Sequence, residues 1–371
     1  MALGEGLTEQ LAAVVRAQRQ QWEFGVGLLD LRALKATMTR TKLAAIRAKR
    51  HLRIATFQLD DLDLERNVPA CDFPVSVELR NFDGFNTLCD SGFVPDLALY
   101  RSHQFWHIDG SYDLRALSEA PHLFADCLNL IWLWDHHHDF EGSFKMALLA
   151  DVVLPMHETG ADYLKIANDF VFAAVPAASA QWGGRALVHE VFEANAQRPR
   201  SDRLYGGFVE YSTFRRNDFI RSCMAAIPDH ALALIKQVRD IQHFGAASRR
   251  ERLVEWMGHK CSLVCALTAD IPIRILDGLL AGQIPLVPHN LNGFDRLISP
   301  RQQRELPVVR YDAFDVASVK AAWQLALALY DRDGVEGAER RHRFVLEGHL
   351  MEHRVIDIVL TVLNVAQAAL V

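Results

Sequence analysis

Short apolar runs that alternate with helical stretches limit the fold of this chain more than any other feature. Strand-like runs in the first half lie at 51–59, 74–79, 97–102, 128–134, 150–155 and 170–175. A second series lies at 203–211, 231–238, 262–267, 284–288 and 307–311, and the remainder is helical to the C-terminus. Apolar runs of this length between helices are typical of parallel sheets with crossover helices. The sequence therefore predicts an α/β protein with two doubly wound, Rossmann-like domains facing a cleft.

Residues 177–203 interrupt this alternation and are loop-like in composition, so we expect the domain junction there. The expected parts are a helical N-terminal extension at 1–50, an acceptor-side domain at 51–200 and a nucleotide-binding domain at 201–371. The last helix of the second domain is expected to cross back to the first. A chain of 371 residues, half of them hydrophobic, can bury two such cores.

The charge and the apolar segments narrow the class of protein. A formal net charge of −6 gives no indication of a nucleic-acid partner, so any phosphate binding must come from local basic residues. No signal peptide is recognised, and no apolar run reaches the ~18–20 residues of a membrane span. We therefore expect a cytoplasmic protein. Its six cysteines lie in apolar settings without zinc-site spacing, which favours small buried side chains in a reducing compartment.

The segment 31–53 contains eight basic residues and no acidic one. These residues are Arg32, Lys35, Arg40, Lys42, Arg47, Lys49, Arg50 and Arg53. Such a surface is a candidate for peripheral contact with the inner face of a membrane or with a phosphorylated acceptor. A solvated helix face and an oligomer contact, for example in a homodimer, are the alternatives.

The most informative segment is 270–288, which reads as a short helix followed by a buried strand at 284–287. Gly282 is placed to end the helix. A helix N-terminus carries free N–H groups and partial positive charge, which suits a diphosphate. The guanidinium group of Arg274 adds a bidentate hydrogen-bond donor in the first turn, and Asp277 is placed to accept hydrogen bonds from ribose hydroxyls.

This segment resembles the donor-binding core of group 1 glycosyltransferases with the GT-B fold. The residues that fit the family's pattern are Arg274, Ala281, Gly282, Pro285 and Val287. Asp277 stands where the family usually has Glu, which shortens the reach by one methylene group. The resemblance covers roughly residues 200–360, while the N-terminal half matches only in the rhythm of its strands.

Three further stretches continue the resemblance. Gly206 and Gly207 resemble the first strand and glycine turn of the donor domain, where a phosphate approaches the backbone. Arg216 belongs to a segment that resembles the start of the next helix, and Lys260 stands where related sequences place a basic residue before a strand. Residues 348–354 resemble the His-x-x-x-His-Arg closing helix of the same subset.

The resemblance implies a glycosyltransferase that takes a nucleoside-diphosphate sugar as co-substrate, with no further cofactor and no bound metal. The acceptor would be a glycan, a lipid-linked oligosaccharide or a protein. The residues implied around the diphosphate and nucleoside are Gly206, Gly207, Arg216, Lys260, Arg274 and Asp277. A nucleotide-sugar epimerase of the same fold and a non-catalytic glycan-binding module remain alternatives.

The candidate catalytic residues follow the apolar strand at 128–134. Asp135, His136 and His137 come where the carboxyl end of a strand meets the expected cleft, and Asp or His can take a proton from an acceptor hydroxyl. A metal site and a polar loop whose histidines bond to the backbone are the alternatives. The letters of residues 349–353 also match the zinc-protease pattern His-x-x-Glu-His, although the closing helix explains the same residues.

Overall fold

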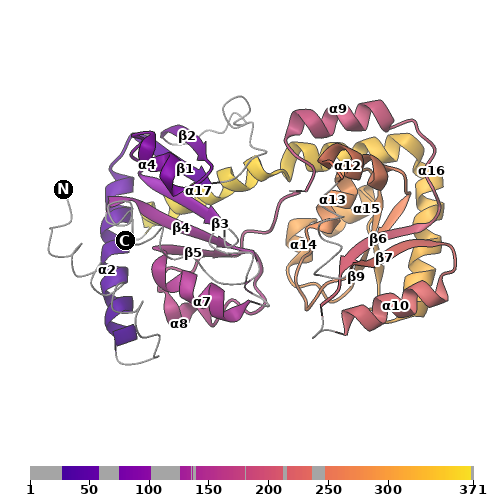
Figure 1. Ribbon diagram of the computed structural model, residues 1–371, viewed down its shortest axis with the longest axis horizontal. Coiled ribbons are helices and arrows are strands. Elements are labelled where there is room, and N and C mark those ends of the chain that lie inside the picture. The colour runs from indigo at the N-terminus through magenta and orange to yellow at the C-terminus, as the bar shows by residue number, and fades with distance from the viewer. Residues whose placement is uncertain are drawn as a thin grey trace. The chain divides into compact units, whose positions relative to one another are not determined.

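The computed structural model describes residues 27–57, 75–101, 126–134, 136, 139–179, 181–211, 215–235 and 247–368. The chain divides into two compact units, each built on its own parallel sheet (Figure 1). The N-terminal unit comprises Met1–Pro176 and Val355–Val371, and the C-terminal unit comprises Ala177–Arg354. Most of the last helix therefore belongs to the N-terminal unit.

The N-terminal unit contains a five-stranded parallel sheet in the order β2-β1-β3-β4-β5. Its strands are β1 (His51–Phe57), β2 (Ser76–Phe82), β3 (Leu97–Arg101), β4 (Leu128–Leu133) and β5 (Val152–Pro155). Its helices are α2 (Gly27–Arg47), α4 (Phe85–Asp90), α7 (Phe140–Leu149), α8 (Leu164–Ala167) and most of α17 (Met351–Ala368). Every residue of β4 and β5 is buried, as expected for parallel strands covered on both faces.

The C-terminal unit contains a second five-stranded parallel sheet, in the order β10-β9-β8-β6-β7. Its strands are β6 (Leu204–Val209), β7 (His230–Ile235), β8 (Cys261–Leu263), β9 (Ile284–Pro288) and β10 (Val309–Tyr311). Its helices are α9 (Arg185–Asn195), α10 (Arg216–Ala226), α12 (Arg249–Met257), α13 (Arg274–Leu280), α14 (Phe294–Leu297), α15 (Pro300–Glu305) and α16 (Val316–Gly348). Counted within each unit, both sheets follow the doubly wound order 2-1-3-4-5. The predicted fold class of two Rossmann-like α/β domains is confirmed.

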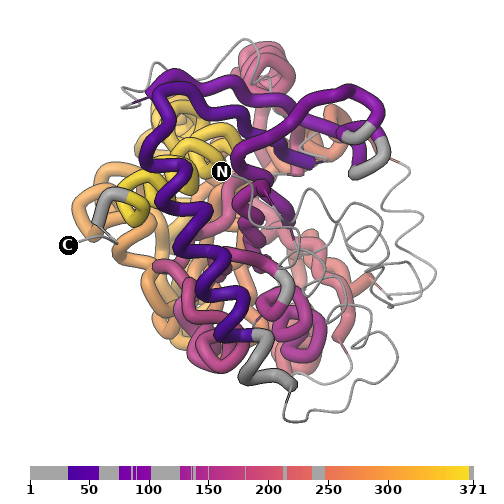
Figure 2. Tube along the Cα trace, turned by 90° about the vertical axis from the view of Figure 1, so that its left-hand side faces the viewer, coloured from indigo at the N-terminus to yellow at the C-terminus, as the bar shows by residue number. Residues whose placement is uncertain are grey.

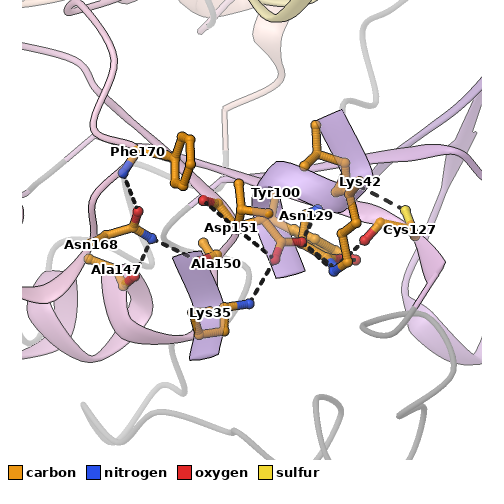
Figure 3. Close-up of polar contacts among 12 residues, drawn as sticks. Lys35, Lys42, Tyr100, Cys127, Asn129, Ala147, Ala150, Asp151, Asn168 and Phe170 are labelled. Carbon is orange, nitrogen blue, oxygen red and sulfur yellow. Dashed lines mark hydrogen bonds and ion pairs between the residues drawn. The ribbon is translucent and has the colours of Figure 1, made fainter. Parts of the chain in front are cut away.

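Helix α2 is anchored to the first sheet by a buried carboxylate. Asp151 is fully buried and accepts from the ammonium groups of Lys35 and Lys42 at 2.9 and 2.7 Å (Figure 3). Burial alone would raise the pKa of Asp151, but the two lysines lower it to about 2. In Figure 2, α2 is the long indigo helix that faces the viewer. It is an integral part of the N-terminal unit rather than an extension, because its lysines complete a buried ion-pair cluster.

Other basic residues of the segment 31–53 also pair within the unit. Arg32 pairs with Asp169, and Lys49 pairs with Asp96. Contact of this segment with a membrane or with a second copy therefore stays a prediction. None of the described helices combines the length and hydropathy that a membrane span requires.

Two boundaries differ from those expected. The units divide between residues 176 and 177, at the start of the predicted junction, because α9 packs against α12 in the C-terminal unit. The expected strand at 170–175 is only an isolated bridge between Val153 and Val171, although three backbone hydrogen bonds hold the segment beside β5. A continued ladder is missing there, so the sheet ends at β5 among the described residues.

The carboxyl end of α13 is fixed by three side chains from elsewhere in the C-terminal unit. Arg200 and Arg341 donate to the carbonyl oxygens of residues 281 and 282 at 2.8 and 3.1 Å. The Nδ1 of His342 lies 2.6 Å from the carbonyl oxygen of residue 280. Gly282 turns the chain there with φ of +77°, and a Cβ would come within 2.9 Å of the Arg200 guanidinium. The positive φ and the close contact favour glycine at this turn, and Gly282 follows the end of the helix as the sequence predicted.

Candidate functional site

The strand order of the C-terminal sheet marks where a ligand is expected. The chain leaves β6 toward β7 on one side, and later strands are added through β8 on the other. In open α/β sheets, ligands bind at the carboxyl ends of the strands where the order reverses. Arg216 begins α10, the helix that follows β6, and Arg274 begins α13, the helix that follows β8. Two predicted donor-binding residues therefore flank the switch point.

Both guanidinium groups lie against one aromatic ring. The guanidinium carbons of Arg216 and Arg274 are 5.9 and 5.2 Å from the centroid of the Phe208 ring. Arg216 also lies 4.8 Å from the ring centroid of Tyr211. Cation–π attraction at these distances orders a guanidinium. Sequence reasoning missed Phe208 and Tyr211, since an aromatic side chain in a strand ordinarily indicates core packing.

Gly206 allows this arrangement, although it does so in a different way from the one expected. It lies within β6 rather than in a turn after the strand, with its backbone paired to Leu232. A Cβ at Gly206 would come within 2.8 Å of a ring carbon of Phe208, so the ring occupies the space a side chain would fill. Gly207 likewise lies inside the strand, opposite Ala233. The two glycines shape the strand and its ring, and the structure does not place them in a phosphate-binding turn.

Neither arginine pairs with a carboxylate among the described residues. Arg216 is 7% exposed and donates to the backbone carbonyl of Val209, while its Nε has no partner. Arg274 is half-buried and makes no hydrogen bond or ion pair within the described chain. Burial lowers the pKa of both groups, and the charge of Arg216 lowers that of Arg274 further. Asp270 acts on Arg216, and Asp277 on Arg274, in the opposite direction. Arginine stays protonated at neutral pH, so both groups carry a positive charge.

Lys260 lies away from this pair. It precedes β8, whereas Arg274 follows that strand, so the two residues lie at opposite edges of the sheet. Its ammonium group pairs with Asp202 and with Asp331, each at 2.5 Å. A strand rises about 3.3 Å per residue, so even the short β8 separates the two edges by roughly 10 Å. The structure does not bring Lys260 to the arginines.

Asp277 is on the correct helix but is buried inside the unit. Its Oδ1 accepts from the Ser179 hydroxyl at 2.5 Å, and the Ser179 backbone N–H donates to the carbonyl of His349. The carboxylate is fully buried, so in this structure it cannot reach a ribose. It connects α13 to the segment that precedes α17.

Of the three candidate catalytic residues, Asp135 and His137 lie outside the described residues. His136 follows β4 and is fully buried. Its Nδ1 lies 3.2 Å from the carbonyl oxygen of Leu133, and its Nε2 lies 3.0 Å from that of His157. These contacts match the alternative in which a loop histidine bonds to the backbone, and the role of His136 as a base stays a prediction.

The histidines of the closing segment also make structural contacts. Burial, with Arg354 and His353 nearby, lowers the pKa of His349 to about 3, and Arg354 lies 2.7 Å from its Nδ1. His353 accepts from the Leu350 backbone N–H at 3.1 Å. Within the described ranges, no group of three His, Cys, Asp or Glu side chains is placed to hold a metal.

Comparison with known proteins gives a likeness in fold. No protein-family model and no curated protein matches the sequence. A sucrose-phosphate synthase from Thermosynechococcus elongatus shares 12% identity over 85% of this chain and 100% of its own, with a TM-score of 0.46. The catalytic domain of starch synthase IV from Arabidopsis thaliana shares 10% identity over 76% of this chain and 75% of its own, with a TM-score of 0.48. An alpha,alpha-trehalose 6-phosphate synthase from Burkholderia multivorans shares 12% identity over 77% of this chain and 75% of its own, with a TM-score of 0.45.

Proposed function

We propose that this chain is a glycosyltransferase whose C-terminal unit binds the diphosphate of a nucleoside-diphosphate sugar between Arg216 and Arg274. The observation that carries the proposal is the pair of guanidinium groups at the switch point of the sheet, without a carboxylate partner in the described chain. In a protein with a net charge of −6, two such cations form a local site of opposite sign. Bidentate guanidinium groups match the geometry of phosphate oxygens.

The arginines suit the chemistry of glycosyl transfer. When the bond between the anomeric carbon and the terminal phosphate oxygen breaks, its electron pair stays on that oxygen. Charge grows on the diphosphate, and fixed guanidinium groups stabilise it more in the transition state than in the ground state. The acceptor hydroxyl forms the new bond to the anomeric carbon and gives its proton to a base, for which Asp135, His136 and His137 are the candidates. The acceptor is a glycan, a lipid-linked oligosaccharide or a protein.

Thermal unfolding with UDP, GDP, TDP, CMP and ADP tests the donor site. A ligand at 100 times its Kd stabilises the folded state by about 2.7 kcal/mol, which is readily visible as a rise in Tm. We expect one of the diphosphates to raise the Tm, and Arg274→Ala to abolish that rise. Arg274→Lys keeps the charge but loses the planar fork, so it should retain part of the rise.

The adjacent Arg215 supplies a matched control, because it is exposed and lies against Phe314 instead of Phe208. Arg215→Ala should leave the nucleotide-induced rise unchanged. If no nucleotide raises the Tm of the wild type, or if Arg215→Ala and Arg274→Ala act alike, the proposed site is wrong. Slow release of free sugar from the bound donor would separate a transferase from a non-catalytic binding module.

A further inference from the structure

The aromatic ring between the two arginines has a role of its own. We infer that Phe208 is a positioning residue that holds the Arg216 and Arg274 guanidinium groups together without neutralising them. This inference rests on the proposed function, since it concerns the same anion site. It gives a specific role to a fully buried strand residue that would otherwise be interpreted as part of the hydrophobic core.

Two like charges, one buried at Arg216 and one half-buried at Arg274, repel each other. Burial already disfavours the charged form of both arginines, and the charge of Arg216 further lowers the pKa of Arg274. Asp270 and Asp277 offset these effects only in part. An opposing carboxylate is the common way to order such a pair, but it would cancel the charge that a phosphate needs. A ring face attracts each guanidinium through its quadrupole and leaves the net charge in place. The centroid of the Phe208 ring lies within 6 Å of both guanidinium carbons, so one side chain contacts both groups.

The backbone is shaped to keep the ring in place. Phe208 and Gly206 are two residues apart on β6, so they share a face of the sheet. The ring lies over Gly206 so closely that a Cβ there would be 2.8 Å from one ring carbon and 3.0 Å from another. The Leu232 side chain closes the same space, with a methyl carbon 3.2 Å from that Cβ position. The ring is therefore confined by packing, and the guanidinium groups are confined by the ring.

Two substitutions separate positioning from simple core packing. Phe208→Leu keeps an apolar side chain but removes the ring face. Phe208→Tyr keeps the ring face but brings a hydroxyl into a fully buried site, which lowers stability. Phe192→Leu is the control for the leucine variant, because Phe192 is an equally buried phenylalanine that stacks on His342, away from the switch point.

The experiment measures the Kd of the full chain for inorganic pyrophosphate by calorimetric titration, well below the Tm of every variant, together with each Tm. We expect Phe208→Leu to raise the Kd about tenfold, as loss of two partly desolvated cation–π contacts implies. Phe208→Tyr should stay within about twofold of the wild type despite a lower Tm, and Phe192→Leu should lower the Tm without changing the Kd.

The outcomes separate this inference from the proposed function. If the wild type binds pyrophosphate and the Kd follows the Tm across all three variants, Phe208 is only a core residue and the inference is overturned. If the wild type does not bind pyrophosphate or any nucleoside diphosphate, the anion site itself is wrong and the inference is overturned with it.

Discussion

Replacing Asp151 with Asn is expected to be among the most damaging single substitutions in the N-terminal unit. The carboxylate is fully buried and compensates two ammonium groups, those of Lys35 and Lys42, at 2.9 and 2.7 Å (Figure 3). Removing one partner of a buried ion pair leaves uncompensated charge and costs roughly 3–5 kcal/mol. The pKa of Asp151, lowered from 3.8 to about 2, indicates that the ionised form is favoured by about 2 kcal/mol. Asp151→Asn should therefore cost roughly 3–5 kcal/mol in the free energy of unfolding.

Urea unfolding at pH 7 measures this cost, with Asp162→Asn as the control. Asp162 pairs with Lys165 at 2.7 Å, the same distance as in the Lys42 pair, but both members of this pair are exposed. A pair in solvent contributes little, so the control should not move the midpoint measurably. Adding Lys35→Met to Asp151→Asn should recover part of the loss, because one buried charge is then removed. Equal midpoints for the two single variants would refute the reasoning.

Three further predictions concern the C-terminal unit. Gly206→Ala should displace the Phe208 ring and lower the free energy of unfolding by about 1–3 kcal/mol, measured in urea, whereas Gly348→Ala, with open space around it, should not. Burial lowers the pKa of His342 from 6.5 to about 4, so the unfolded chain takes up the proton first. Stability should therefore fall as the pH drops from about 6.5 to 4, and this loss should shrink in His342→Gln when urea midpoints are compared across that range. Lys260→Ala should leave the Kd for a nucleoside diphosphate unchanged, because its ammonium group is held at the opposite edge of the sheet; a tenfold rise would contradict that placement.

Much of the fold could be predicted because buried parallel strands are continuous apolar runs. The strand at 284–288 was predicted at its observed bounds, and most of the others within two or three residues. The expected strand at 170–175 was apolar enough to be recognised, but pairing depends on a neighbouring strand that the sequence alone does not place. The role of α2 was missed for a similar reason. From the sequence, its lysines are expected to be solvent-exposed. Only the fold brings Asp151 to them, and Asp151 is 109 residues from Lys42 along the chain.

Only part of the candidate site could be predicted from the sequence, again for physical reasons. Arg216 and Arg274 were predicted as donor-site residues from segments that resemble helix starts in a known family, and the structure places each at the start of a helix that follows a strand. Lys260 has the right charge but precedes its strand, and the direction of a strand decides which edge a flanking residue reaches. Asp277 is on the expected helix, yet its face turns inward to Ser179. Contacts between residues far apart in the chain, such as that pair, are set by packing and leave no local pattern.

The most direct test of the central claim compares two adjacent arginines in a calorimetric titration with the nucleoside diphosphate that stabilises the wild type. Arg216 lies against Phe208 at the switch point, while Arg215 points to Phe314. Loss of a charge-assisted phosphate contact costs roughly 1.5–3 kcal/mol. Arg216→Ala should therefore raise the Kd by a factor of about 10–150, and Arg215→Ala should leave it within about twofold. Equal affinities for the two variants would contradict a diphosphate site at Arg216 and Arg274, and with it the proposal that this chain is a glycosyltransferase.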